Sequence, residues 1–314
     1  MPISLPPDVA ANIAESFGER GPRWLRELPQ VVDRLCGTWD LEVVGDSFGG
    51  GTHSWVAPVR RSDGSAAVLK VPVVDEENVG EPAGLVAYDG DGAVRLYEFD
   101  SASGAMLLEW ARPGTELLHQ PGFPSLEGRP ENVGKIESAC AIYRRLRREP
   151  DVIPDGYPAL PEAAGMVAEW VRLFHEPEPE LAQVIPQSLR ERAVQWCVEL
   201  AVPDGPLLVV NRDTHLGNIV AAHREPWLLI DPKPYLGEAA FDAGFLVMIQ
   251  VQSDPTAEHA HVVVERTAAA LEISPERAQG WAFMRAMEEI AWALQDDEPE
   301  DLRLHSAVAQ ALSR

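Results

Sequence analysis

Two aspartates and an asparagine near the middle of the chain could bind a metal ion and accept a proton. Asp213 comes shortly after the apolar run LLVV, Asn218 lies five residues later, and Asp231 directly follows a second apolar run, WLLI. Carboxylate and amide oxygens are ligands that Mg²⁺ prefers, and proteins usually hold Mg²⁺ with one or two side chains plus substrate phosphates. A further carboxylate beside such a pair can accept a proton from an attacking hydroxyl group. Each residue alone is equally typical of a turn or a helix cap, so the hypothesis depends on the rest of the chain.

A lone lysine, Lys70, ends the apolar run AAVLK. Burying its ammonium without a partner would be costly, so we expect an anion beside it, such as a pair of phosphates. Glu81, on the helix expected next, is the carboxylate that would orient Lys70, although the three acidic residues at 75–77 are alternatives. Pro82 must then lie in the first turn of that helix, because a proline deeper inside costs roughly 3 kcal/mol. The competing interpretation is a lysine at a strand end that reaches water.

A glycine loop, SFGGGTHS, lies between two strand-like segments. Gly50 and Gly51 would let the backbone approach a polyphosphate closely, and Ser54 would offer a hydroxyl donor. The loop is not a Walker motif, which needs GxxxxGK followed by Ser or Thr at the start of a helix. A tight hairpin turn explains the same glycines equally well.

The elements around these residues change in character near residue 110. Strand-like segments occur at 41–46, 54–60, 66–73, 93–100 and 105–110, and two more short strands are expected between 209 and 234. Apolar spacing predicts helices at 7–35, 78–88, 131–149, 159–175, 187–201, 239–253, 256–271, 275–295 and 299–313. Strands followed by helices, instead of alternating with them, argue against a Rossmann sheet.

The composition excludes several kinds of partner. The 314 residues carry 26 basic and 50 acidic side chains, a formal net charge of −24. Such a surface repels nucleic acids and anionic membranes and would attract a cationic small molecule, although acidity can also serve solubility alone. The sequence has no apolar run long enough for a transmembrane helix, and its first residues do not resemble a secretory signal. Three widely spaced cysteines indicate reduced thiols, so we expect a cytoplasmic protein.

The motifs together resemble a known family. The segments GGGTHSWVAPV, AVLKVP, LLEW, DTHLGNIV and IDPKPYLGEAAFD are similar to those of the aminoglycoside phosphotransferase branch of the protein-kinase-like fold, in particular the streptomycin and hydroxyurea phosphotransferases. The last segment is the most specific, because kinases in general do not carry it. The resemblance implies a two-lobed α+β fold, with a β-rich N-lobe at 1–110 that clamps the nucleotide and a helical C-lobe at 111–314.

The resemblance also implies a role for each residue. It makes the protein an ATP-dependent kinase with a small-molecule acceptor. The implied roles are a catalytic base (Asp213), Mg²⁺ ligands (Asn218, Asp231), a phosphate-binding lysine and its ion-pair partner (Lys70, Glu81), hinge residues that meet adenine (Glu109, Ala111) and an aspartate that braces the catalytic loop (Asp242). Streptomycin or a related guanidinium-bearing aminoglycoside is the expected acceptor, with hydroxyurea or an unrelated metabolite as alternatives. The enzyme would be a monomer or a dimer.

The chain departs from its relatives just before the catalytic loop. Relatives usually carry His-Gly before the aspartate, whereas this chain has Asn211 and Arg212. An asparagine amide can donate a hydrogen bond but cannot fill the space of a histidine. This departure motivates an alternative, a kinase-fold binding protein with little turnover. A protein kinase is a further alternative, disfavoured because no Ala-Pro-Glu segment follows DPKP.

Two adjacent acids near the C-terminus, Glu288 and Glu289, could line the pocket of a cationic acceptor. They lie on a predicted helix whose apolar residues have core spacing. A solvated helix face is the competing interpretation. His259 and His261 have no evident third metal ligand, and His215 is expected to pack within the catalytic loop.

Overall fold

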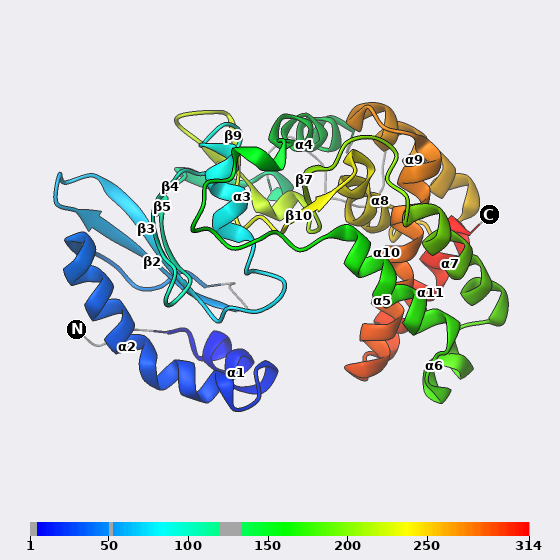
Figure 1. Cartoon of the computed structure of the whole chain (residues 1–314), viewed down its shortest axis with the longest axis horizontal. Helices are drawn as coiled ribbons and strands as arrows, with labels where there is room; N and C mark the ends of the chain where they lie inside the picture. The colour runs from blue at the N-terminus through cyan, green and yellow to red at the C-terminus, as the bar shows by residue number, and fades with distance from the viewer. Residues whose placement is uncertain (1–4, 50–52, 120–132, 314) are drawn as a thin grey trace.

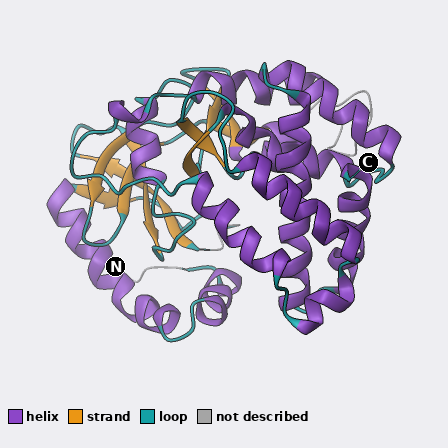
Figure 2. Ribbon diagram, turned by 45° about the vertical axis from the view of Figure 1, so that its right-hand side comes forward, coloured by secondary structure: helices purple, strands orange, loops and turns teal. Residues whose placement is uncertain are grey.

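The structure is a computed structural model that describes residues 5–49, 53–119 and 133–313. Its N-terminal part contains a five-stranded antiparallel sheet in the order β1-β2-β3-β5-β4. The strands are β1 (Leu41–Val43), β2 (Ser54–Arg61), β3 (Ala66–Pro72), β4 (Leu96–Asp100) and β5 (Ala105–Glu109). The sheet lies to one side of the molecule and most of the helices to the other (Figures 1 and 2).

The central strand β3 carries Lys70 and determines the face of the sheet to which its side chain points. Side chains alternate between the two faces of a strand. Ala67, Leu69 and Val71 pack in one apolar cluster with α2 (Arg20–Trp39), which covers the outer face of the sheet, and α1 (Pro7–Ser16) packs against α2. Lys70 therefore points to the opposite face, toward α3 (Glu81–Tyr88).

Helix α3 begins at Glu81, and Pro82 lies in its first turn, as the sequence required. The helix is almost entirely buried, and Glu81 itself has no exposed surface. In Figure 1, α3 lies between the N-terminal sheet and the helical part of the molecule.

Small β elements connect the two parts. The segment between 209 and 234 was expected to supply two strands, but the structure has four around it: β7 (Leu208–Asn211), β8 (Ile219–Ala222), β9 (Trp227–Leu229) and β10 (Pro234–Gly237). β7 pairs with β10, and β8 pairs with β9 and with β6 (Pro113–Glu116), a strand that the sequence did not predict. These strands are three or four residues long, too short to show an apolar period.

The remaining helices build the C-terminal part around one apolar core. They are α4 (Val133–Leu146), α5 (Ala163–His175), α6 (Pro179–Val184), α7 (Gln187–Leu200), α8 (Ala243–Val251), α9 (Ala257–Leu271), α10 (Pro275–Gln295) and α11 (Pro299–Leu312). The short helix α6 is not among the helices that the sequence predicts. Helix α10 packs against α7, α8, α9 and α11, so its side chains are mostly buried. None of the described helices is long and apolar enough to cross a membrane.

Candidate active site

Lys70 joins two carboxylates from distant parts of the chain. Its ammonium donates to both carboxylate oxygens of Glu81, at 2.7 and 2.6 Å, and to Oδ1 of Asp231 at 2.7 Å. Burial alone would lower the pKa of Lys70, but Asp231 and Glu81 outweigh it, and the pKa is raised. Burial would raise the pKa of Asp231, yet Lys70 and Lys233 together hold it below its usual range. Lys70 and Asp231 are therefore both charged at neutral pH.

Asp231 has an unusual backbone conformation. Its φ of +46° lies in the left-handed region, which aspartate tolerates better than most residues but which is uncommon outside glycine. Such conformations concentrate at functional sites, where the surrounding structure holds them in place. Here the preceding residue, Ile230, donates its N–H to the carbonyl of Asn218 at 2.8 Å, which fixes the two predicted metal ligands beside each other.

The predicted catalytic loop, which includes Asp213, His215 and Asn218, leaves one oxygen of Asp213 open. Asn218 Nδ2 donates to Oδ2 of Asp213 at 3.2 Å, and His215 Nε2 lies 3.5 Å from the same oxygen. The N–H of Gly217 donates to His215 Nδ1 at 3.0 Å, which puts the ring proton on Nε2, facing Asp213. Both contacts fall on Oδ2, and no described side chain bonds Oδ1. Asp213 can therefore accept a further proton on Oδ1.

The unusual Asn211 has its own partners. Its side-chain amide donates to the hydroxyl of Tyr88 at 3.2 Å, and its backbone N–H donates to Oδ1 of Asp242 at 2.8 Å. Arg147 donates to Oδ2 of Asp242 at 3.0 Å. Asp242 thus holds the start of the catalytic loop, and Asn211 joins that loop to the C-terminal end of α3.

Arg212 is mostly buried between two acids. Its Nη1 donates to Glu77 at 3.2 Å and its Nη2 to Glu288 at 3.0 Å. Glu77 lies in the segment between β3 and α3, and Glu288 lies on α10. The arginine that follows Asn211 therefore connects the N-terminal part, the catalytic loop and α10.

The two acids on α10 differ in their contacts. Glu288 accepts from Arg212, from Arg285 and from Trp170 Nε1, the last at 3.1 Å. Glu289 has one hydrogen bond within the described residues, from Arg285 Nη2 at 2.8 Å, and its side chain is 18% exposed. Burial raises the pKa of Glu289, against the attraction of Arg285. Glu289 therefore has capacity for another cation, whereas Glu288 is occupied by protein partners.

Two of the predicted nucleotide contacts lie at the ends of inner strands of the sheet. Ser54 begins β2, and Glu109 ends β5, where its side chain accepts from Arg224 at 2.9 and 2.8 Å. Ala111 follows two residues later and is half-buried. Gly50 and Gly51 lie outside the described residues, so their contribution stays a prediction.

The sequence matches the family model described as aminoglycoside/hydroxyurea antibiotic resistance kinase over residues 39–297. The chain belongs to this family. Streptomycin 6-kinase of Streptomyces griseus is 32% identical over 318 residues, covering 99% of this chain and 98% of that protein. Hydroxyurea phosphotransferase of Kitasatospora aureofaciens is 31% identical, covering 99% of this chain and 86% of that protein. The kinase is therefore an ATP-dependent phosphotransferase that acts on a small molecule.

A solved structure supports the fold independently. A thermostable mutant of aminoglycoside phosphotransferase APH(4)-Ia, in its apo form, superposes with a TM-score of 0.58, covering 90% of this chain and 98% of that one. At 12% identity this likeness concerns the fold alone. The two-lobed α+β fold expected from the sequence is confirmed.

Sequence reasoning missed two residues of the site. Lys233 donates to Oδ1 of Asp231 at 3.2 Å, and Tyr88 holds Asn211. Lys233 stands in the segment IDPKP, where a second lysine so close to Asp231 was an available signal. Tyr88 gave none, because its partner lies 123 residues away in the chain.

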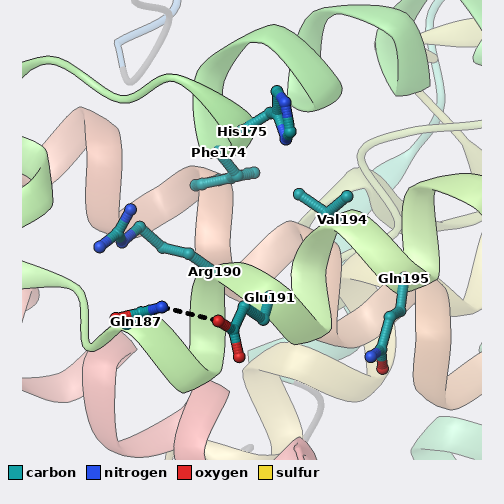
Figure 3. Close-up of a pocket in the computed structure, with 7 residues that line it drawn as sticks. All are labelled: Phe174, His175, Gln187, Arg190, Glu191, Val194 and Gln195. Carbon is teal, nitrogen blue, oxygen red and sulfur yellow. Dashed lines mark hydrogen bonds between the residues drawn. The ribbon is translucent and has the colours of Figure 1, made fainter.

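The kinase also has a crevice of about 560 Å³ between α5 and α7 (Figure 3). Its lining residues are Phe174, His175, Gln187, Arg190, Glu191, Val194 and Gln195. Gln187 and Glu191 bond each other at 2.8 Å, and the predicted catalytic residues are not among those lining the crevice. We assign the crevice no part in the reaction.

Proposed function

We propose that this kinase transfers the γ-phosphoryl group of ATP to a hydroxyl group of streptomycin or a related guanidinium-bearing aminoglycoside. Hydroxyurea and an unrelated small metabolite are the alternative acceptors. The observation that carries the proposal is the open oxygen of Asp213, which Asn218 links through Ile230 to the strand that leads into Asp231, the partner of Lys70. In this proposal residues 1–110 clamp the nucleotide and residues 111–314 hold the base and the acceptor.

The donor set fits one or more Mg²⁺ ions. Asn218 uses its amide nitrogen on Asp213, which leaves its oxygen for a metal, and Oδ2 of Asp231 has no hydrogen bond within the described residues. No group of three or more His, Cys, Asp or Glu side chains able to hold a metal is found among the described residues. Two protein oxygens supplemented by phosphates are typical of Mg²⁺ sites in kinases.

The protein groups then act as follows. Asp213 orients the acceptor hydroxyl and takes its proton on Oδ1 while the hydroxyl oxygen forms a bond to the γ-phosphorus. The bond from the γ-phosphorus to its bridging oxygen breaks, and ADP leaves with that electron pair. Lys70 steadies the phosphates. Asn218 and Asp231 would hold Mg²⁺, which would supply positive charge to offset that of the phosphates.

The acceptor side supports a cationic molecule. Glu289 offers a partly exposed carboxylate near Trp292, whose ring lies 5.3 Å from the Arg285 guanidinium and 5.1 Å from that of Arg212. The net charge of −24 would also attract a cation. The three cysteines are free thiols, which suits the reducing cytoplasm where we place the enzyme.

A coupled assay of ADP release, run over aminoglycosides, hydroxyurea and small polyols with Mg²⁺ and ATP, tests the proposal. We expect streptomycin to give acceptor-dependent ADP release well above the background. ADP release stimulated by hydroxyurea alone would make hydroxyurea the acceptor in place of streptomycin. ADP release that no acceptor stimulates would favour the alternative, a kinase-fold binding protein with little turnover.

A further inference from the structure

The two lysines on Asp231 differ in how many of their hydrogen-bond donors are used. A lysine ammonium has three N–H donors. Lys70 directs all three at carboxylate oxygens, two on Glu81 and one on Asp231. Within the described residues Lys233 makes one hydrogen bond, to Oδ1 of Asp231 at 3.2 Å. Lys233 is thus the ammonium of this site with donors left for a ligand.

The environment of Lys233 makes those donors costly to leave without an acceptor. Its side chain is 15% exposed, and the only described carboxylate oxygen that it reaches is already bonded to Lys70. A largely buried cation with a long, shared hydrogen bond gains stability when an anion enters. Phosphoryl oxygens are such an anion.

The backbone places Lys233 next to Arg212, the residue that precedes the predicted base. Its carbonyl accepts from the N–H of Arg212 at 2.9 Å, and the next residue, Pro234, pairs with Asn211 in the β10–β7 ladder. Lys233 therefore lies alongside the residues that lead into Asp213, while its ammonium reaches Asp231.

The composition also singles out this pair of lysines. The chain has 23 arginines and only three lysines, Lys70, Lys135 and Lys233. Two of those three meet at one oxygen of Asp231. A compact ammonium acts as a point charge that fits beside a tetrahedral phosphoryl group, whereas a guanidinium is a broad, planar fork.

We propose that Lys233 binds the γ-phosphoryl group of ATP and donates to its oxygens during transfer. The inference rests on the proposed phosphotransfer at Asp213. Lys233 donates hydrogen bonds and moves no proton, so the bonds made and broken are those already described. On nucleotide binding its ammonium turns from Asp231 toward the phosphoryl oxygens, while Lys70 stays paired with Glu81.

Calorimetric binding of ADP and of the non-hydrolysable β,γ-methylene analogue of ATP tests this assignment without turnover. Lys233→Met should weaken binding of the analogue about tenfold or more, because a charged hydrogen bond is lost, and binding of ADP less than about twofold. The selective loss should persist when Mg²⁺ is omitted. Equal weakening of both nucleotides, or of neither, overturns the proposal. A loss seen only with Mg²⁺ also overturns it, because Lys233 would then act through Asp231.

Three further variants keep the test decisive. Lys233→Arg retains a cation and should keep most of the preference for the analogue; if it loses as much as Lys233→Met, packing is responsible and the assignment is wrong. Lys233→Gln replaces Lys233→Met if the latter does not fold, as judged by thermal unfolding. Asp213→Asn should keep the nucleotide preference while losing transfer, so a wrong base assignment is distinguishable from a wrong role for Lys233.

Discussion

Arg212 donates to Glu288 across 3.0 Å, so the residue just before the predicted catalytic base is fastened to the middle of α10. Both side chains are 11% exposed, and Arg285 contacts the same carboxylate. The arginine that looked out of place in the sequence therefore has a partner. Its charge is compensated within the fold, and the catalytic loop gains a support from α10.

Glu288→Gln should destabilise the kinase more than Glu289→Gln. Removing one member of a buried ion pair leaves uncompensated charge and costs about 3 kcal/mol. Glu289 is partly exposed and has one arginine partner, so its loss should cost about 1 kcal/mol or less. Chemical denaturation of the two variants measures the difference. Equal losses would mean that Glu288 does not hold Arg212 as the structure indicates.

The same two variants should separate positioning from acceptor binding. Glu289→Gln should raise KM for streptomycin about tenfold with little change in KM for ATP, because it removes a charged contact to the acceptor. Glu288→Gln should instead lower kcat, since it loosens the loop that carries Asp213. Steady-state kinetics with both substrates varied gives the result. An unchanged streptomycin KM in Glu289→Gln would remove Glu289 from the acceptor site.

Tyr88→Phe should weaken the catalytic loop without touching any charged group. The substitution leaves the buried amide of Asn211 without the tyrosine hydroxyl, at a cost of about 1–3 kcal/mol in the free energy of unfolding. We expect kcat to fall while nucleotide binding stays close to that of the wild type. Tyr97→Phe, on β4 and half-buried, is a matched control that should change neither property. If Tyr88→Phe behaves like that control, Asn211 does not depend on the hydroxyl.

The ionisation of Asp231 predicts a pH dependence of stability. Its pKa is held below the unfolded value of about 3.9, so the unfolded chain binds more protons near that pH and stability falls as pH drops through this range. The stabilisation that Asp231 gains from Lys70 and Lys233 is fully present at pH 7. Asp231→Asn should therefore destabilise the protein more at pH 7 than at pH 3.5. The same loss at both pH values, measured by urea denaturation, would contradict the ion pairs.

The sequence predicted the parts of the site that stand next to strands and helices in the chain. Lys70 was found because a lone cation in an apolar run needs an anion, and Glu81 because a carboxylate on the helix expected next could orient that lysine. The order of strands and helices followed from apolar spacing, which long elements such as α10 display over several turns.

What the sequence left open depends on contacts between distant residues. Glu288 and Glu289 are identical neighbours in the sequence, and only the packing of α5 and the catalytic loop against α10 separates them. The partner of Asn211 is a tyrosine on α3, 123 residues away in the chain. No local periodicity carries such information.

Mass spectrometry of streptomycin after incubation with ATP, Mg²⁺ and enzyme tests the central claim most directly, with wild type and Asp213→Asn compared side by side. The wild type should add about 80 Da, the mass of one phosphoryl group, and Asp213→Asn should add none. Streptomycin left unmodified by the wild type would contradict the proposed acceptor. Modification by Asp213→Asn at the wild-type rate would contradict the assignment of Asp213 as the base.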